Sequence, residues 1–374
     1  MKKNLIISIA LIFTLIGFLC AGESNCEIPG KLITTGNIPS LETLGINSKK
    51  LSEALKFAEK LPRLNSLLIA KNNYLVVEKY FNGFNRKKPG NIKSITKNIL
   101  SALVGIAIQK GYLKNINQKI HEFFPNEFKP NWNPQKKEIT IKHLMTMTSG
   151  LESTSFKNIN AWISSDHWVR YVLTRKLIRK PGKTFDYSTG NTHLISAILT
   201  KTTGMNTLEF AQKHLFNHLD IQVNHWQKDP QGIYYGGNNM SLTALDLLKF
   251  GVLYLNNGKY NGKQLVPEEW VKTSTSFQVD PERFWSPFHL EGYGYLWWRF
   301  RMGPYEHYAA WGHGGQFIFI IPDLKLVVVV TSRWQGASST VYYRNLSKLM
   351  EVPMAWGTYR PFMPPEGGWH PRPI

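Results

Sequence analysis

The feature that most restricts the fold is a pair of apolar segments in the last third of the chain. Residues 316–321 and 324–331 flank the turn Pro322-Asp323 and predict a β-hairpin. The second segment, Leu-Lys-Leu-Val-Val-Val-Val-Thr, is apolar at almost every position, which is typical of a strand in a buried, central place. The chain is therefore expected to build a sheet around this strand.

A second hairpin is expected far away in the sequence, where residues 66–71 and 74–80 flank the turn pair Asn72-Asn73. Helices are expected at 94–110, 141–147, 161–172, 192–202, 208–219, 243–255 and 344–350. The first of these is apolar around most of its circumference, which indicates a buried helix. The order of strands, helices and strands predicts an α+β fold, an α/β sandwich with an antiparallel sheet built from both chain ends and flanked by helices.

This pattern also predicts how the chain is divided. The expected parts are a signal peptide at 1–21, an N-terminal lead-in at 22–60 with one amphipathic helix near 52–60, a sheet domain from 61–110 and 241–350, an inserted helical domain at 111–240, and a tail rich in Pro and Gly at 351–374.

The N-terminus has the order of residues that is typical of a secretory signal. Lys2 and Lys3 precede an apolar run at 5–19, and small residues follow at Ala21 and Gly22. The run is short for a membrane-spanning helix, which needs about 20 apolar residues. We therefore expect a periplasmic or secreted protein, with an uncleaved N-terminal anchor as the alternative. Lipidation at Cys20 is disfavoured because bulky Leu19 precedes it, and cleavage would leave Cys26 as the only cysteine, without an internal disulfide.

Composition excludes several classes of protein. Hydrophobic residues make up 43% of the chain, so it is not a disordered protein. The 45 Lys and Arg against 25 Asp and Glu give a net charge of +20. Such a charge suits nucleic acid, an anionic membrane or cell wall, or simply a basic secreted protein. Because no zinc-finger, RNA-recognition or Walker pattern accompanies this charge, specific nucleic-acid binding is not expected. The sequence implies no metal and no cofactor.

The first candidate for chemistry is Ser94-Ile-Thr-Lys97. On a helix, Ser94 and Lys97 lie one turn apart on the same face. A lysine whose pKa is lowered by a dry environment and nearby cations can activate the serine hydroxyl. The alternative is a serine at a helix N-terminus beside a solvated lysine.

Two further segments carry candidate residues. Tyr187, in Phe185-Asp-Tyr-Ser-Thr-Gly190, could act as a base only as phenolate, and lowering its pKa from near 10 to 7 costs about 4 kcal/mol. In Trp311-Gly-His-Gly-Gly-Gln316, Gly314 and Gly315 would let a substrate approach the backbone, and the N–H that follows could complete an oxyanion hole with the Ser94 N–H. His313 could donate a hydrogen bond or carry positive charge near the substrate. The alternatives are a buried structural Tyr and a β-bulge with a packed His.

Together these segments resemble the serine β-lactamase-related superfamily. The resemblance is strongest to the class C β-lactamase-like hydrolases, which include family VIII esterases, D-amino peptidases and 6-aminohexanoate-dimer hydrolases. Three more segments fit that resemblance, which spans roughly residues 60–345: Ile139-Thr-Ile-Lys-His-Leu-Met-Thr-Met-Thr-Ser-Gly-Leu151, Ser241-Leu-Thr-Ala-Leu-Asp-Leu-Leu-Lys-Phe-Gly251 and Tyr293-Gly-Tyr-Leu-Trp-Trp298. It implies a β-lactamase/transpeptidase-like fold with the active site in a cleft between sheet and helical regions.

The resemblance also implies a role for each candidate residue. Ser94 would be the acylated nucleophile, Lys97 its activating partner and Tyr187 a general base or proton shuttle; which of Lys97 and Tyr187 takes the proton is left open. The N–H groups of Ser94 and Gln316 would form the oxyanion hole. His313, Gly314 and Gly315 would stand where relatives have a Lys-Thr-Gly or His-x-Gly strand.

Two departures from the resemblance bear on the substrate. Thr189 stands where relatives often have an Asn that would hydrogen-bond a β-lactam side chain, and His313 replaces the lysine of true β-lactamases. An uncharged His would bind the penicillin carboxylate weakly. Both changes favour an esterase or amidase acting on a small molecule. Trp297, Trp298 and Trp311 either line an apolar cleft or belong to the core.

The leading expectation is therefore a secreted serine hydrolase that cleaves a small ester or amide through an acyl-enzyme. A β-lactamase or D,D-peptidase acting on cell-wall peptides is the alternative of the same class. A catalytically silent envelope-binding protein is the alternative of another class. The sequence does not predict the oligomeric state or the physiological substrate.

Overall fold

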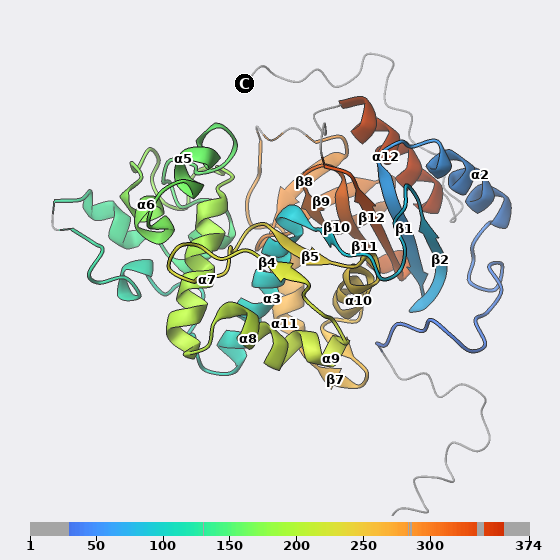
Figure 1. Ribbon diagram of the computed structural model, residues 1–374, viewed down its shortest axis with the longest axis horizontal. Coiled ribbons are helices and arrows are strands. Elements are labelled where there is room, and N and C mark those ends of the chain that lie inside the picture. The colour runs from blue at the N-terminus through green and yellow to red at the C-terminus, as the bar shows by residue number, and fades with distance from the viewer. Residues whose placement is uncertain (1–29, 130, 283, 285, 335–339, 355–374) are drawn as a thin grey trace, which may run out of the picture.

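The computed structural model describes residues 30–129, 131–282, 284, 286–334 and 340–354. A sheet with covering helices forms one side of the molecule. A mainly helical part forms the other side, and it includes α5 (Ile159–Ile163), α6 (Trp168–Thr174) and the longer α7 (Thr189–Thr203) (Figure 1). The expected signal peptide, and the part of the expected tail after residue 354, lie outside the described residues. Where the domain boundaries fall stays a prediction. Within the described ranges, no helix combines the length and the apolar content needed to cross a bilayer.

The main sheet has seven strands in the order β2-β1-β12-β11-β10-β9-β8, and every neighbouring pair is antiparallel. The strands are β1 Leu64–Lys71, β2 Tyr74–Tyr80, β8 His289–Tyr293, β9 Trp298–Met302, β10 Tyr305–Gly312, β11 Gln316–Ile321 and β12 Leu326–Ser332. The two predicted hairpins join where β1 pairs with β12, with Leu68 opposite Val329. The sheet is thus built from both ends of the chain, as expected.

The apolar character of β11 and β12 follows from burial of both sheet faces. Helix α10 (Ala244–Leu255) packs on one face, where Gly251 contacts Val327 and Ile318. Helices α2 (Ser48–Glu59) and α12 (Thr340–Met354) pack together on the other, where the rings of Tyr343 and Phe317 meet (Figure 1). Because successive residues of a strand point to opposite faces, both sets of side chains are covered.

The two hairpin turns differ from each other. Asn72 and Asn73 have φ angles of 50° and 68°, the left-handed conformation that a tight two-residue turn requires. The β11–β12 connection is longer than expected: a 3₁₀ turn at Pro322–Leu324 is followed by Lys325 with φ of 45°. Strand β12 consequently starts at Leu326 rather than at residue 324.

The remaining helices are mostly short. They are α3 Thr96–Gln109, α4 Ile141–Met145, α5 Ile159–Ile163, α6 Trp168–Thr174, α7 Thr189–Thr203, α8 Thr207–Ala211, α9 Asn217–Leu219 and α11 Glu268–Thr275, with a π-helical segment at Gln212–Phe216 between α8 and α9. Short 3₁₀ turns occur at η1 Lys93–Ile95, η2 Ile120–Glu122, η3 Pro134–Glu138 and η4 Phe156–Asn158. Small sheets pair β3 (Gly90–Asn91), β5 (Met240–Leu242) and β4 (His225–Trp226), and β6 (Lys259–Tyr260) with β7 (Lys263–Gln264).

The continuous helix expected at 161–172 is wrong, because α5 and α6 are separated by residues 164–167. The Ser165 hydroxyl donates to the Trp162 carbonyl, and the His167 ring accepts from the Arg170 N–H to begin the next helix. Such local side-chain bonds compete with helix continuation. The lead-in helix starts at Ser48, four residues before the expected start, because Asn47 caps it.

The contact between α10 and the sheet yields a stability prediction. A Cβ on Gly251 would lie 2.5 Å from Val327 Cγ1 and 2.8 Å from Ile318 Cγ2. Helix propensity alone would make Gly251→Ala stabilising by about 1 kcal/mol. We expect the opposite sign, a loss of about 1–3 kcal/mol, because α10 must move off the sheet. Urea unfolding measures this change. Lys56→Ala, exposed on α2, serves as control, and a Gly251→Ala protein as stable as wild type would contradict the packing.

Candidate active site

The expected nucleophile, Ser94, lies in the 3₁₀ turn η1 immediately before α3, where it is half-buried. Lys93 before it has φ of 54°, an unusual conformation for a residue other than glycine. The Asn91 side chain accepts from the Lys93 N–H at 2.9 Å, and the Lys93 ammonium lies 3.6 Å from the centre of the Trp334 ring. These contacts hold the turn that presents Ser94.

Helix α3 is the buried helix that the sequence predicts, and its polar side chains fix its position. Asn98 Nδ2 donates to the Leu296 carbonyl at 2.8 Å, and Ser101 Oγ donates to the Tyr295 carbonyl at 2.7 Å. On the neighbouring α11, the Trp270 ring is so close to Gly105 that a Cβ there would lie 2.4 Å from it. The helix therefore cannot rotate without losing buried hydrogen bonds.

Lys97 projects from the first turn of α3 toward Ser94. Its side chain is buried, with 2% of the residue exposed. Its Nζ donates to Ser94 Oγ at 3.1 Å and to the Gly237 carbonyl at 2.7 Å. Burial lowers the pKa of Lys97 to about 7, because removal from water disfavours the charged ammonium. The amine is consequently available in its neutral form near neutral pH.

Gly237 was not among the residues singled out in the sequence. A Cβ on Gly236 would lie 2.1 Å from the Thr192 carbonyl oxygen, and one on Gly237 would lie 2.9 Å from Lys97 Nζ. The adjacent glycines thus let this segment run against α7 and bring a carbonyl to the lysine. A buried bond of 2.9 Å between His193 of α7 and Asp229 holds the same loop. In the sequence, the adjacent pair Gly236-Gly237 is the signal that could have indicated this close approach of the backbone.

Tyr187 lies beside Ser94 and Lys97, as expected. Lys97 Nζ is 5.1 Å from the centre of the Tyr187 ring, and the ring stacks on Trp298 at 5.9 Å. Burial raises the pKa of Tyr187, and a hydrogen bond with the Ser94 hydroxyl opposes the rise only in part. The side chain is therefore a neutral phenol at physiological pH.

Thr189 opens α7, and its polar atoms are engaged within the protein. Its hydroxyl is 2.8 Å from Ser155 Oγ, which also accepts from the Thr189 N–H at 2.8 Å. Its methyl group faces Gly237. The residue thus anchors the start of α7 beside the lysine.

The His313-Gly-Gly segment is the turn between β10 and β11, and η1 packs against both strands. A Cβ on Gly312 would lie 2.5 Å from the Ile92 carbonyl oxygen, so the turn adjoins the backbone that leads to Ser94. The Gly314 N–H donates to the Tyr343 hydroxyl at 2.9 Å. Gly315 has φ of 91°, which favours glycine.

His313 and Gln316 at this turn differ in their surroundings. His313 is exposed, and desolvation of its ring together with the Lys93 charge lowers the pKa of the imidazole. It is therefore largely neutral at pH 7. The Gln316 side chain is buried and exchanges two hydrogen bonds with the backbone of Ser332, at 2.7 and 3.1 Å.

Comparison with known proteins identifies the family of this chain. A sequence model described as Beta-lactamase matches residues 65–348. The chain belongs to the beta-lactamase family. Proteins of this family are typically serine hydrolases, and the group includes esterases, amidases and penicillin-binding-protein homologues. The resemblance and the fold class predicted from the sequence are thereby confirmed.

Individual relatives are distant. The chain is 24% identical over 317 residues to an uncharacterized protein of Alkalihalophilus pseudofirmus, covering 77% of this chain and 88% of the relative. Its structure resembles a protein assigned as a 6-aminohexanoate-dimer hydrolase from Bacillus anthracis, with a TM-score of 0.68, 21% identity and coverage of 82% and 81% of the two chains. It also resembles EstCE1, titled a hydrolase with promiscuous acyltransferase activity, with a TM-score of 0.66, 15% identity and coverage of 80% and 98%. At these identities the two structural likenesses show the fold alone.

The aromatic residues near the site of this beta-lactamase-family protein divide into two groups. Trp297 is fully buried and packs on Tyr254 at 4.5 Å, so it belongs to the core. Trp298 and Trp311 lie 5.4 Å apart and belong to the cluster around Tyr187. Two residues missed in the sequence complete that cluster: Phe284, 5.7 Å from the Tyr187 ring, and Phe156, which is 67% exposed and 6.1 Å from it.

The site offers hydroxyl, amine and phenol groups rather than a set of metal ligands. Across the described ranges, no three His, Cys, Asp or Glu side chains gather as a metal site would need. The chemistry that this arrangement can perform is proton transfer and nucleophilic attack by Ser94.

Burial of Lys97 leads to a prediction about stability. Because its pKa is lower in the folded than in the unfolded protein, the unfolded chain binds more protons between pH 7 and 10.5. The lysine therefore costs on the order of 4 kcal/mol at pH 7, and the cost disappears as pH rises to 10.5. We expect Lys97→Met to increase the free energy of unfolding at pH 7 by about 1–3 kcal/mol, since losing the bond to Gly237 offsets part of the gain.

Urea titrations of wild type and Lys97→Met at pH 7 and pH 10 measure this difference. Lys110→Met, at an exposed position just after α3, is the matched control and should show little change at either pH. A Lys97→Met protein less stable than wild type at pH 7 would contradict a costly buried amine.

Proposed function

We propose that this protein is a serine hydrolase that cleaves a small ester or amide through an acyl-enzyme on Ser94. The observation that carries the proposal is the contact between a buried lysine and the serine, with Nζ 3.1 Å from Oγ and a lysine pKa of about 7. An amine that is half deprotonated at neutral pH is suited to act as a general base.

In the proposed reaction, neutral Lys97 takes the proton from Ser94 Oγ as this oxygen attacks the substrate carbonyl carbon. One N–H of the neutral amine keeps its bond to the Gly237 carbonyl, and the bond to Ser94 reverses, so that the Ser94 hydroxyl, 3.1 Å away, donates to the amine lone pair. The carbonyl oxygen gains negative charge, which the N–H groups of Ser94 and Gln316 would stabilise. The contact of Ile92 with Gly312 supports this assignment, because it brings the two backbone segments together.

The proton must next reach the leaving group, and Tyr187 is suited to deliver it. Its raised pKa argues against a phenolate base and favours a phenol that donates to the departing alcohol or amine. The Lys97 ammonium, 5.1 Å from the centre of the Tyr187 ring, then returns a proton to the tyrosine oxygen through a bound solvent molecule. Water then attacks the acyl-enzyme, and Lys97 acts again as base, releasing the acid and restoring Ser94.

The surroundings favour an ester or amide over a β-lactam. A neutral His313 offers no permanent positive charge to a penicillin carboxylate, and the Thr189 hydroxyl is already bonded to Ser155. The aromatic cluster with partly accessible Tyr187, Phe284 and Trp311 suits an apolar acyl or alcohol group. A β-lactamase or D,D-peptidase, and a silent envelope-binding protein, are the competing functions.

Location and partners are part of the proposal. The basic, apolar and small-residue order of residues 1–21 supports export to the periplasm or the outside of the cell. The net charge of +20 supports loose association with an anionic envelope rather than specific nucleic-acid binding. The proposed substrate is a small molecule.

The mechanism predicts covalent labelling at one residue. Exposure of the signal-free protein to a fluorophosphonate should add a single adduct that intact-mass measurement detects, and Ser94→Ala should abolish it. Ser241→Ala, at another partly buried serine, should leave it unchanged. Ester turnover should fall by at least about 10³-fold in Ser94→Ala.

Other outcomes of this experiment distinguish the proposed hydrolase from the silent binding protein and from the β-lactamase. No adduct on folded wild-type protein would favour the silent binding protein. Labelling accompanied by nitrocefin turnover as fast as ester turnover would favour the β-lactamase alternative. Full ester activity in Ser94→Ala would reject the proposed nucleophile.

The identity of the base predicts the pH dependence. Below its pKa of about 7, Lys97 is protonated and cannot accept the serine proton, so kcat/KM should rise about tenfold per pH unit and level off above pH 7. Tyr187→Phe should lower kcat yet keep the same midpoint. A rate that keeps rising beyond pH 10 would instead identify the phenolate as base.

A further inference from the structure

Phe156 is a large apolar side chain that the fold leaves in water beside the proposed active site. It is 67% exposed, the largest exposed fraction among the exposed large apolar side chains of the described residues. Its backbone has φ of 52°, in the left-handed region that a bulky residue adopts only at a cost. Burial of the ring does not offset that cost. Strained residues of this kind cluster at functional sites, so the conformation of Phe156 points to a role in binding.

The backbone before Phe156 is tied to the segment that carries the proposed acid. Ser153 Oγ donates to the Tyr187 carbonyl at 2.6 Å, and Ser155 Oγ accepts from the Thr189 N–H at 2.8 Å. Ser155 is buried, so its bond is shielded from water. The backbone that presents the exposed ring is therefore fixed relative to Tyr187.

Phe156, Tyr187 and Phe284 form a triangle of aromatic rings. The ring centres are 5.7 Å apart for Tyr187 and Phe284, 6.1 Å for Phe156 and Tyr187, and 6.4 Å for Phe156 and Phe284. The three pairs are tilted by 47°, 42° and 46°. Tyr187 and Phe284 are themselves partly exposed, so the triangle offers an accessible apolar surface made of ring faces and edges.

The triangle begins one tyrosine ring away from the proposed nucleophile. A hydrogen bond joins the Tyr187 side chain to the Ser94 hydroxyl, while the Tyr187 ring contacts Phe156 and Phe284. In the proposed reaction the substrate carbonyl oxygen turns toward the backbone N–H groups, and the Tyr187 hydroxyl meets the leaving oxygen or nitrogen. A group attached to that leaving atom would extend along the Tyr187 ring toward the triangle, whereas the acyl group extends from the carbonyl carbon in another direction.

The chemistry of the triangle indicates what this group is. An apolar group that covers the Phe156 ring removes its surface from water, which favours binding. Tilted rings also suit a further flat ring, because edge-to-face and offset contacts between aromatic rings add to the gain from burial alone. An aliphatic group of the same size would obtain only the gain from burial.

We infer that the triangle of Phe156, Tyr187 and Phe284 binds the leaving group of the substrate, and that this group carries an aromatic ring. The substrate class is thus an ester or amide of an arylalkyl alcohol or amine. The inference rests on the proposed function, because the role of Tyr187 assigns the leaving-group side.

Two isomeric esters test the side on which the ring binds. Benzyl acetate carries the ring on the alcohol, and methyl phenylacetate carries the same ring on the acyl part. Each kcat/KM is divided by the rate constant for hydroxide-catalysed hydrolysis of the same ester, which removes differences in intrinsic reactivity. We expect signal-free wild-type protein to prefer benzyl acetate by at least about tenfold.

A third ester tests the aromatic character of the leaving group. Cyclohexylmethyl acetate has the bulk of benzyl acetate but no flat ring. We expect its corrected kcat/KM to be at least about threefold lower than that of benzyl acetate. Equal values for the two esters would overturn the aromatic class.

Variants locate the binding surface. Phe156→Ala should lower the preference for benzyl acetate over methyl phenylacetate at least about fivefold, mainly through KM. Phe156→Tyr keeps the ring and should keep the preference. Phe277→Ala removes another exposed phenylalanine, which is 55% exposed and lies against Gly292, and should leave the preference unchanged. Because the preference is a ratio measured on one preparation, partial unfolding of a variant does not alter it.

Fluorophosphonate labelling of Ser94 separates this inference from the hydrolase proposal. Labelled wild-type protein that cleaves both isomers equally, or prefers methyl phenylacetate, would overturn the inference and leave the hydrolase standing. A Phe156→Ala protein with the full wild-type preference would do the same. Absence of both labelling and ester turnover would reject the hydrolase, and the leaving-group site with it.

Discussion

The structure depends on one constraint, an amine held out of water. Lys97 is enclosed by α3, Tyr187 and the segment at Gly237, and burial lowers its pKa to about 7. A charged lysine there would require either water or a carboxylate, and its two described hydrogen-bond partners, a hydroxyl and a carbonyl, are neutral. The fold encloses the lysine. Burial destabilises its charged form, and the amine is therefore neutral and basic at the pH where the proposed chemistry needs it.

The rigid layers around the lysine explain how the protein tolerates that cost. Helix α3 is buried along most of its length, and strands β11 and β12 are covered on both faces. Side-chain bonds from Asn98 and Ser101 to the segment at residues 295–296 fix the rotation of α3. The position of Lys97 follows from that rotation. Packing of the apolar core therefore determines how Lys97 lies relative to Ser94.

The sequence predicted the features that local patterns encode. The i, i+3 spacing of Ser94 and Lys97 places them on one helical face, and the Asn72-Asn73 turn between apolar segments defines a hairpin. The order of the segments, together with the family resemblance, was enough for the antiparallel sheet and its flanking helices.

What escaped prediction depends on contacts between distant segments. The Gly237 carbonyl reaches Lys97 from 140 residues away in sequence. Phe156 and Phe284 join the cluster around Tyr187 from separate loops. Trp297 and Trp298 are neighbours, yet only the second meets Tyr187, because alternate residues of an extended segment point to opposite sides. None of these pairings has a periodic signal that one sequence could display.

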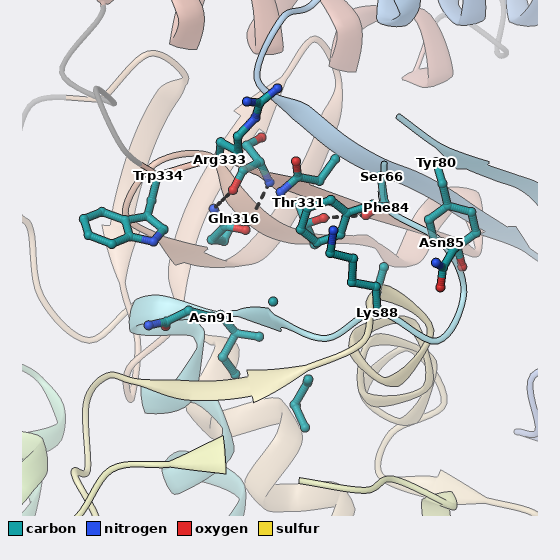
Figure 2. Close-up of a pocket in the computed structure, with 16 residues that line it drawn as sticks. Ser66, Tyr80, Phe84, Asn85, Lys88, Asn91, Gln316, Thr331, Arg333 and Trp334 are labelled. Atoms are coloured by element: carbon teal, nitrogen blue, oxygen red, sulfur yellow. Dashed lines mark hydrogen bonds between the residues drawn. The ribbon is translucent and has the colours of Figure 1, made fainter. Parts of the chain in front are cut away.

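The short stretch from Gly90 to Ser94 joins the proposed active site to a cavity of about 270 Å³ between the main sheet and the small β3–β5 sheet (Figure 2). Gly90, Asn91 and Ile92 line the cavity, and Ser94 follows them at the lysine. Between them, Lys93 is held in a left-handed conformation by Asn91 and by the Trp334 ring, both of which also line the cavity. Strained backbone persists only where its surroundings fix it, so the cavity walls are part of what keeps Ser94 in place.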